Sequence, residues 1–580
     1  MKPSSTILKQ GTFMQRKYKK LLIAGILMWM VTLVDSCADT FLAGIFINEN
    51  AVSGVELVSP YFSILSFVAY IISMGTALLY SRESGAFRHE RAYGIVGQGI
   101  ICAAGASVIL VIAMIVLREP LMNFYSSSAE VTAYANEYYT YQLFFALMYP
   151  MFYLLSELVI IDGDEIVPAV ATVTMAAVNM GASLLFVKSH GVKGLALGTV
   201  VGAACGLLVY CTHFLRKTNS IRVRLHFSVM DVSEMAKLSS STAVTLLYVA
   251  IIDIIMNKYV ISRFTDAYLP AYAVINFVLN LGEVCSSTFD AASGFISVGF
   301  GEKNPASIKR VMKIATVSVI IESLAALVIL QFVAPAISTF YGITDPQVAV
   351  AAAHAARITA ISFPAIGLYY LYCAYYPAVE YVLLGNITTV VYMLITPLAV
   401  AMPLGNAFGF EGLTWGFALT AVIAILVTVL IIRIKYGKKA VPLALRDTDE
   451  ESLLYDISLS PESIITLIDR VRSDLSERGV SAHVLNEVSL VLEESYMTIL
   501  AENPKKKTLS ECNILLSDKS LRLITRDNGR IFDITDANAK IKDLRSYVLA
   551  CLMERNPKRS HVTTISFNRN CYVWDFETNE

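Results

Sequence analysis

Two acidic residues lie inside a long apolar stretch near the start of the chain. Residues 21–46, LLIAGILMWMVTLVDSCADTFLAGIF, include Asp35 and Asp39. A spacing of four places both carboxylates on one face of a helix. A carboxylate at membrane depth costs roughly 2.5–3.5 kcal/mol on insertion scales, so it usually faces a bundle interior or an ion path. We therefore take Asp39 as the leading functional candidate. The alternative is that one acid, more readily Asp35, is bonded to a neighbouring hydroxyl or backbone group and serves helix packing.

Further polar side chains lie within later apolar stretches. They are Gln142, Glu157 and Asn179, followed by Asp253, Asn257, Asn276, Asn280, Glu283, Asp290, Glu322 and Asn386. A net acidic interior suits a cationic cargo or a coupling cation, so we select Asp253, Glu283 and Asp290 as pathway candidates. Lys258 is expected near the end of its span or beside an acid. The amides are weaker indicators, because Asn also joins helices through hydrogen bonds.

Twelve apolar stretches predict the helices that would position these residues. They are 21–46, 56–80, 95–117, 136–160, 167–187, 192–215, 239–263, 271–298, 312–334, 356–378, 380–402 and 412–434. Each is close to the ~20 residues that a helix needs to cross a bilayer. The sequence therefore predicts an α-helical polytopic membrane protein.

The composition favours the same class. Of the 580 residues, 56% are hydrophobic and 16% are charged, and the mean hydropathy is +0.59. Soluble chains contain about 25% charged residues. The nine cysteines form no CxxC pair or Cys/His cluster, so we expect neither a disulfide framework nor a metal site. The near-zero net charge of −1 does not indicate a nucleic-acid partner, and we expect none.

Basic residues gather in alternate loops and predict the orientation. The loops on one side contain Arg82, Arg88 and Arg91; Arg216, Lys217, Arg222 and Arg224; Lys303, Lys309 and Arg310; and Arg433, Lys435, Lys438 and Lys439. This bias places both termini in the cytoplasm. One inner loop, 156–168, is acidic and departs from the pattern.

The two halves of the apolar region resemble each other. GVKGLALGTVVGAACGLLV at 191–209 aligns with GFEGLTWGFALTAVIAILV at 409–427, the first inner loop falls against 299–311, and Asp39 falls against Asp253. A parallel repeat of six helices indicates two lobes about an axis along the membrane normal.

These stretches resemble the multidrug and toxic compound extrusion (MATE) transporters over roughly residues 20–435. The resemblance is carried by ADTFLAG, SGVELVSPYFSIL, SRESGAFRHERA, DGDEIVPAV and AVNMGASLLFV with GVKGLALGTVVG. It implies a two-lobed antiporter that uses Na⁺ or H⁺ to expel organic cations and needs no organic cofactor. The family's first-helix aspartate falls on Asp39 and its fifth-helix asparagine on Asn179. The family's acid four positions later is Ser183 here, so the usual ion site lacks one carboxylate.

Near residue 445 the composition changes from apolar to mixed and charged, and the sequence RDTDEES indicates the start of a soluble region. Two stretches with helical periodicity and two with alternating polarity predict an α/β sandwich over 450–580. LVLEESYMT and ITRDNGRIFDI resemble the GHKL ATPase domain of anti-sigma-factor kinases. In that resemblance Glu494 falls on the general base, and Asp527 and Gly529 fall on the adenine-binding turn. Thr498 replaces the magnesium-binding asparagine, and 543–552 lacks the glycine-rich lid, so we expect a degenerate domain in which ATP and Mg²⁺ binding would be residual.

The predicted organisation is a tail (1–20), a lobe (21–215), a linker (216–238), a second lobe (239–437), a linker (438–449) and the α/β domain (450–580). Efflux of organic cations from a cell, with membrane lipid around the bundle, is the leading hypothesis. A membrane-anchored signalling protein whose tail binds nucleotide or a protein partner is the second. Flipping of lipid-linked saccharides is the third, although it would favour a cationic cavity.

Overall fold

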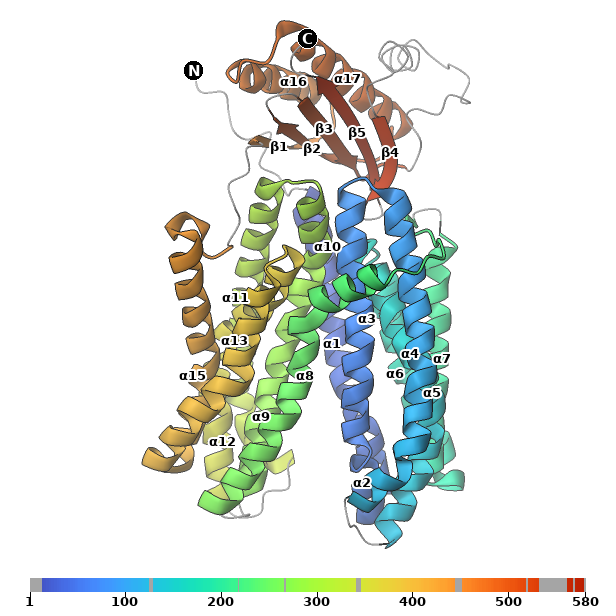
Figure 1. Cartoon of the computed structure of the whole chain (residues 1–580), viewed down its shortest axis with the longest axis vertical. Coiled ribbons are helices and arrows are strands. Elements are labelled where there is room, and N and C mark those ends of the chain that lie inside the picture. Colours follow the sequence, from blue (N-terminus) through green and yellow to red (C-terminus); the bar gives the residue numbers. More distant parts are fainter. Residues whose placement is uncertain are drawn as a thin grey trace.

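The computed structural model describes residues 13–124, 129–216, 219–264, 268–340, 346–443, 451–517, 520–530, 561–566 and 569–577. Residues 543–552, where the sequence lacks the glycine-rich lid, lie outside the described residues. A helical bundle contains the first part of the chain, and a sheet with two helices lies against one of its ends (Figure 1). We call this end of the bundle the domain side and the opposite end the far side.

The described residues of the N-terminal lobe form seven helices. They are α1 (Phe13–Phe46), α2 (Glu49–Glu56), α3 (Ser59–Gly85), α4 (His89–Phe124), α5 (Ala129–Ile161), α6 (Ile166–His190) and α7 (Val192–Phe214). Large apolar side chains such as Ile23 and Leu185 point out of the lobe, at 68% and 76% exposure. Such outward apolar surface is typical of helices that face lipid.

The C-terminal lobe repeats this plan with more interruptions. Its helices are α8 (Val229–Phe264), α9 (Leu269–Gly282), α10 (Ser287–Gly301), α11 (Pro305–Phe340), α12 (Pro346–Ala360), α13 (Phe363–Ala378), α14 (Val382–Val390) and α15 (Met402–Tyr436). A 3₁₀ turn, Glu283–Ser286, joins α9 to α10, and two π-helical turns join α14 to α15. The segment 216–238, which we predicted as a linker, contains the start of α8.

Ten helices of the described chain are long and apolar enough to cross a membrane, or eleven if α12 and α13, bent by 50°, form one span. The last of them, Val382–Tyr436, is 55 residues long and includes two of the twelve predicted stretches. It contains a break at Gly409, whose φ of 72° and ψ of −157° are not helical.

Paired glycines support the predicted repeat of the two lobes. Gly191 adopts φ 57° and ψ −136°, which closely matches the backbone of Gly409 in the other lobe. Both conformations lie at positive φ, where glycine meets no steric penalty. A Cβ on Gly194 would lie 2.5 Å from the Phe186 backbone, and one on Gly412 would lie 2.2 Å from the Leu404 carbonyl. The same motif therefore makes the same tight helical hairpin twice.

Four turns on the domain side share one backbone motif. At Phe87, Gly163, Lys303 and Glu380 the φ values are 57°, 82°, 57° and 68°. At each turn this residue donates its N–H three residues back and the next residue donates five residues back, as in Phe87 to Ser84 and Arg88 to Glu83. This is the Schellman motif, which ends a helix through one left-handed residue. Its presence twice in each lobe extends the internal repeat to the level of single turns.

The acidic inner loop that departs from the charge pattern is neutralised internally. His213 contacts Asp162 at 2.8 Å and Asp164 at 3.0 Å, and Arg216 contacts Asp164 at 2.7 Å. Burial would raise the pKa of Asp164, but the His213 hydrogen bond, backbone N–H groups and Arg216 together lower it to about 2. Glu165 forms an ion pair with Lys17. The exception to the loop charges is therefore a buried ion-pair cluster.

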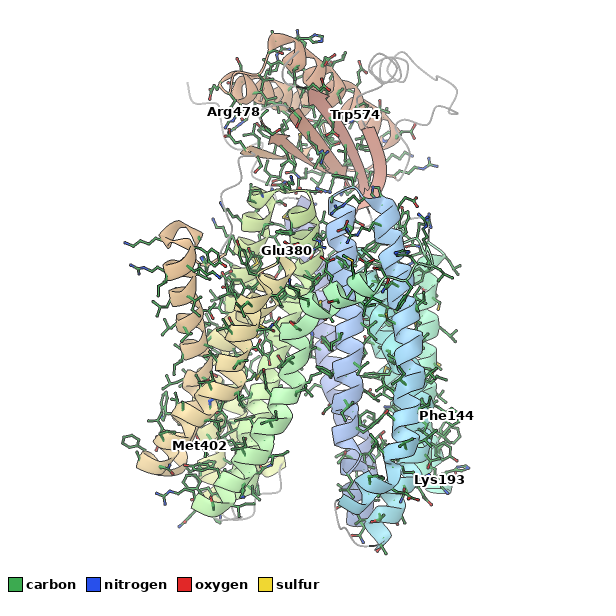
Figure 2. The ribbon with its side chains drawn as sticks, viewed as in Figure 1. Phe144, Lys193, Glu380, Met402, Arg478 and Trp574 are labelled. Carbon is green, nitrogen blue, oxygen red and sulfur yellow. The ribbon has the colours of Figure 1, made fainter. Side chains whose placement is uncertain are left out.

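The described part of residues 451–577 holds one antiparallel sheet in the order β1-β2-β3-β5-β4. Its strands are β1 (Glu451–Ser458), β2 (Leu509–Leu516), β3 (Ser520–Asp527), β4 (His561–Ser566) and β5 (Arg569–Glu577). The helices α16 (Pro461–Ser476) and α17 (Ala482–Glu502) cover one face. Val488, Leu492, Leu523 and Trp574 belong to the core between the helices and the sheet. The other face is turned toward the bundle, as the side chains in Figure 2 illustrate.

Candidate functional site

Asp39 lies in the interior of the N-terminal lobe, where three helices meet. Its side chain is buried, and the hydroxyl of Tyr138 on α5 donates to its Oδ2 at 2.6 Å. The hydroxyl of Thr199 on α7 donates to the same oxygen at 2.9 Å. The second oxygen, Oδ1, is buried and has no hydrogen-bond partner among the described residues. Since a buried carboxylate oxygen normally has a partner, Oδ1 is available for a proton or a cation.

Asp35 lies one turn earlier on α1 and faces a different partner. The side-chain amide of Asn179 on α6 donates to its Oδ1 at 2.9 Å, and the Ser183 hydroxyl donates to the side-chain Oδ1 of Asn179 at 3.2 Å. Asp35 and Asp39 are close enough to interact electrostatically. The structure thus brings Asp35, Asp39, Asn179 and Ser183 into one lobe interior. The hydrogen bond between Asp35 and Asn179 also joins α1 to α6, so it agrees with the alternative that Asp35 serves helix packing.

Three residues of this site were not predicted as site residues from the sequence. Tyr138 and Thr199 are common residue types in membrane helices, and only the pairing of α1 with α5 and α7 brings them to Asp39. Gln142, noted as a polar residue in its span, is one turn from Tyr138. It is fully buried, and its amide has no hydrogen-bond partner in the described part of the chain. A buried amide of this kind adds an unused donor and acceptor beside the carboxylate.

A second acidic group lies where the two lobes meet. Asp290 on α10 accepts a hydrogen bond from the Trp29 indole on α1 at 3.0 Å. Glu157 on α5 is buried and is close enough to Asp290 for electrostatic repulsion. Glu283 accepts from the Tyr370 hydroxyl at 2.9 Å. All three acids are within electrostatic range of the hydroxyl of Tyr70 on α3.

Aromatic rings extend from this acidic group into both lobes. In the N-terminal lobe the ring of Tyr153 lies 5.7 Å from that of Tyr70 and 4.7 Å from that of Tyr149. In the C-terminal lobe the rings of Tyr369 and Tyr392 are 4.0 Å apart. Aromatic faces attract cations through the ring quadrupole, and nearby carboxylates add to this attraction.

The remaining acid among the predicted pathway residues, Asp253, is not part of either group. Its Oδ1 accepts from Asn276 on α9 at 3.1 Å, inside the C-terminal lobe. Lys258 lies on the exposed surface toward the far end of α8. Glu322, among the polar span residues, accepts from Ser287 and Thr288 at 3.3 and 2.9 Å.

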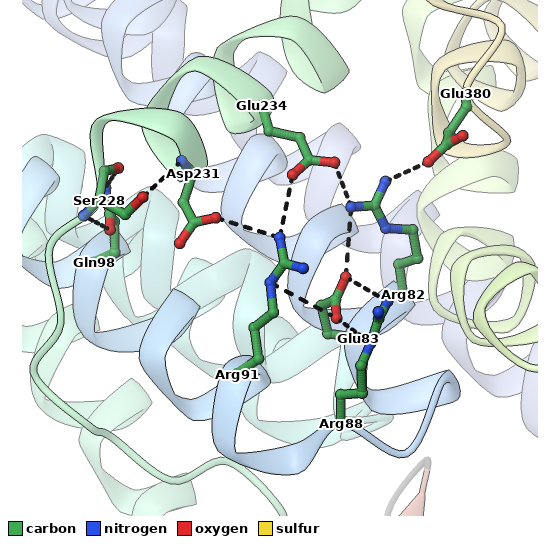
Figure 3. Close-up of polar contacts among 9 residues, drawn as sticks. All are labelled: Arg82, Glu83, Arg88, Arg91, Gln98, Ser228, Asp231, Glu234 and Glu380. Atoms are coloured by element: carbon green, nitrogen blue, oxygen red, sulfur yellow. Dashed lines mark hydrogen bonds and ion pairs between the residues drawn. The ribbon is translucent and has the colours of Figure 1, made fainter.

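The lobes are held together on the domain side by an ion-pair network (Figure 3). Arg82 at the end of α3 pairs with Glu234 on α8 and, at 2.8 Å, with Glu380 in the α13–α14 turn. Arg91 on α4 lies 3.4 Å from Asp231 on α8. The Gln98 amide exchanges two 2.8 Å hydrogen bonds with the backbone of Ser228, completing the contact between α4 and the start of α8.

The residues compared with the adenine-binding turn hold their own loop. Asp527 ends β3, and its Oδ1 accepts from the Gly529 N–H at 2.6 Å and from Asn570 at 3.1 Å. Glu494 and Thr498 lie one turn apart on α17, and the Thr498 hydroxyl donates to the Glu494 carbonyl at 2.7 Å. Thr498 therefore uses its hydroxyl inside the helix. These contacts give a turn and a helix their shape without requiring a nucleotide.

Comparison with known sequences points to one family. The family model described as MatE matches residues 21–185. A relative named multidrug export protein MepA, from Staphylococcus haemolyticus, is 17% identical over 413 residues, covering 70% of this chain and 90% of the relative. The MepA of a Staphylococcus aureus strain is 16% identical over 250 residues, covering 42% of this chain and 55% of that protein.

Solved structures of MATE transporters and of a further MOP superfamily transporter have a similar fold. An outward-facing multidrug resistance MATE family transporter of the MOP superfamily aligns with a TM-score of 0.68 and 18% identity, over 74% of this chain and 99% of its own. The MATE transporter VcmN of Vibrio cholerae in its bent form aligns with a TM-score of 0.64 and 16% identity, over 72% of this chain and 96% of its own. A MOP superfamily transporter from Pyrococcus furiosus, whose binding pocket is described as having reverse polarity, aligns with a TM-score of 0.66 and 17% identity, over 75% of this chain and 98% of its own. These likenesses show that the bundle has the fold shared by these transporters.

Proposed function

We propose that this chain, a multi-pass membrane protein whose bundle has the MATE fold, is a secondary active exporter of organic cations rather than an enzyme. A gradient of Na⁺ or H⁺ drives the export. The observation that carries the proposal is the buried carboxylate of Asp39, which has two hydroxyl donors on one oxygen and an unpaired second oxygen. The names of the similar proteins, multidrug export protein and multidrug resistance transporter, favour the same activity.

Asp39 is the proposed coupling group. Hydrogen bonds from Tyr138 and Thr199 favour its charged form, whereas burial favours its neutral form. A proton or Na⁺ on Oδ1 shifts this balance, because it neutralises the buried charge. Asp35, held by Asn179, supplies a second carboxylate where Ser183 replaces the acid that the family resemblance would place on α6.

The acids between the lobes are the proposed cargo site. Glu157 comes from the N-terminal lobe, and Glu283 and Asp290 come from the C-terminal lobe. A cationic cargo therefore relieves repulsion between groups on both lobes, and its release restores that repulsion. A ligand that binds one lobe arrangement better than the other is what alternating access requires.

The proposed topology places both termini in the cytoplasm, following the loop charges. We count Val382–Tyr436 as two spans separated at Gly409, since 55 helical residues would reach about 80 Å across a hydrocarbon core of about 30 Å. With α12 and α13 as one span the total is twelve. On this count the domain side is cytoplasmic.

The signalling alternative has one observation in its favour. The C-terminal sheet contacts the turn after α3 and the turn after α10, so a change in the bundle could reach the domain. In that case the bundle would bind a ligand without moving it. Transport measurements with the purified protein separate the two functions.

The test is uptake or release of a fluorescent organic cation by proteoliposomes under separate Na⁺ and pH gradients. We expect one gradient to drive the dye in the wild type and neither to drive it in Asp39→Asn. The matched control is Glu137→Gln, which removes a carboxylate next to Tyr138 in sequence that is 43% exposed and paired with Lys193. The proposal is wrong if Asp39→Asn transports the dye as the control does. Binding of the dye without gradient-driven movement in the wild type would favour signalling.

A further inference from the structure

The C-terminal sheet is buried on both faces, and the bundle covers the second one. In β3, Leu521 and Leu523 belong to the core beneath α16 and α17, while Ile524, one residue on, belongs to a separate cluster. That cluster contains Leu515, Ile524, Cys571 and Val573, with Phe87 from the bundle packed against it. Alternate strand residues point to opposite faces, so this sheet has one face for its own helices and one for the bundle.

The contact with the N-terminal lobe is made by the turn between α3 and α4. Phe87 has its φ at 57° in this turn, which projects its ring toward the sheet. The Arg522 guanidinium lies 5.5 Å from the ring centre. The helix-ending turn thus presents a phenylalanine at its left-handed position, and the ring packs against Leu515, Ile524, Cys571 and Val573 of the sheet.

The contacts with the C-terminal lobe are ion pairs on α10 and α11. Glu302 follows the last residue of α10 and pairs with Arg526 of β3, and both side chains are at most 5% exposed. Glu511 of β2 lies 3.8 Å from the same guanidinium. Arg310 of α11 pairs with Asp456 of β1. Removing one member of a buried ion pair leaves the other charge uncompensated, so these contacts depend on the domain being docked.

The two contact areas meet in a region that is polar and not fully packed. A cavity of about 40 Å³ is lined by Phe87 and His89 from the N-terminal lobe, Glu302 from the C-terminal lobe, and Arg526 and Cys571 from the sheet. A polar space of this size can hold water. Polar, hydrated surfaces are typical of interfaces between domains that separate and rejoin.

We infer that the C-terminal sheet is a clamp that spans the inner ends of both lobes, holds them together and so favours the outward-facing state. Two observations lead to this inference, which deepens the proposed function. The same sheet contacts Phe87 in one lobe and Glu302 in the other. The two turns that present these residues are equivalent in the internal repeat, so they separate from each other when the lobes open inward.

The clamp acts beside the direct contacts between the lobes. The network around Arg82 already joins α3 to α8 and to the α13–α14 turn. Several of its members are half exposed, as Glu380 is at 58%, and exposed ion pairs contribute little. The buried pair of Glu302 and Arg526 lies under the sheet instead. Undocking of the sheet would expose both residues to water and leave the lobes joined only by their direct contacts, which are the surface network and the close packing of α3 against α10 at Gly85 and Gly301.

The inference is tested by the separation of the lobes in the full-length protein. Spin labels introduced at Ser189 on α6 and Ser262 on α8 report the opening of the far side by electron-electron resonance distances in lipid nanodiscs. Both positions are exposed. Two variants weaken the clamp at different lobes: Phe87→Ala and Glu302→Gln. Glu302→Gln keeps the side-chain size, and Arg526 retains Glu511 nearby, which limits the risk to folding.

We expect either variant to reduce the ratio of far-side-open to far-side-closed molecules by about tenfold, because a charge-assisted contact and a packed phenylalanine side chain each contribute about one factor of ten or more. The double variant should add little, since a clamp released from one lobe no longer holds the other. The control is Glu451→Gln, which weakens a 2.7 Å pair with Arg478 on the helix-facing side of the domain. We expect it to leave the distances unchanged.

Identical distance distributions in wild type, both variants and control would overturn the clamp. Additive effects of the two variants would also overturn it, because they would indicate two independent local contacts. The measurement does not require transport. A protein that moves no dye but shifts its distances as expected would refute the proposed export and retain the clamp.

Discussion

Replacing Tyr138 with phenylalanine removes one of the two hydrogen bonds to Asp39 and leaves the ring in place. The Tyr138 hydroxyl lies 2.6 Å from Oδ2, the shorter of the two contacts to that oxygen. The hydroxyl donates to the carboxylate, so its loss disfavours the charged form of Asp39 relative to the protonated form. The perturbation therefore acts on the coupling group without removing its charge.

The size of the effect follows from the type of bond. A hydrogen bond to a charged group contributes about 1.5–3 kcal/mol, and 1.36 kcal/mol corresponds to one pH unit. We expect the pH at which transport is half-maximal to rise by about 1–2 units in Tyr138→Phe. Thr199→Val, which removes the 2.9 Å contact, should move the midpoint in the same direction.

The assay is dye transport by proteoliposomes across a pH series, with the total gradient held constant. The neighbouring Tyr139 provides a matched control. It is equally buried, and its hydroxyl donates to the Met114 carbonyl at 2.9 Å instead of to Asp39. Tyr139→Phe should keep the wild-type midpoint. Equal midpoints for Tyr138→Phe and Tyr139→Phe would refute the assignment of Asp39 as the group that titrates during transport.

Two further predictions concern the domain side. Lys303 is exposed and has a φ of 57°, so Lys303→Gly should raise the free energy of unfolding by roughly 0.5–1 kcal/mol. Lys309→Gly, within α11, should lower the free energy of unfolding by about 1 kcal/mol. Melting temperatures of the two purified variants should therefore shift in opposite directions. Burial raises the pKa of Asp456 to about 6, opposed by Arg310 and assisted by Glu511. Because the docked state then binds the proton more tightly, docking should strengthen as pH falls below 6 and weaken as pH rises through 6. Between pH 7.5 and pH 5 the far-side-open ratio should rise by about tenfold more in the wild type than in Asp456→Asn, which keeps the titration of Asp39 but lacks that of Asp456.

The positions of the apolar helices followed from the sequence because membrane spanning is a local requirement. A helix must satisfy its own backbone and present about 20 apolar residues to lipid, and each such stretch can be read without its neighbours. The glycine motif was also readable, since Gly191 and Gly409 need positive φ wherever the hairpin occurs. The predicted stretches at 271–298 and 356–378 are each broken in the structure, by a 3₁₀ turn and by a 50° bend.

An acid within an apolar helix is easily recognised in a sequence. Because placing a carboxylate at membrane depth costs free energy, other groups in the structure must stabilise it. The sequence by itself therefore determined that Asp39 has a special environment, as well as the class of the protein and its repeat. Only the tertiary structure decided what that environment is. Tyr138 and Thr199 reach Asp39 from helices about 100 and 160 positions further along the chain, and Glu157 meets Asp290 across the lobes. Only the tertiary structure likewise brings Phe87 and Glu302, from different lobes, under the same sheet. Such contacts depend on how helices rotate and pair, and periodicity along a single chain contains no record of which neighbours a polar side chain will meet.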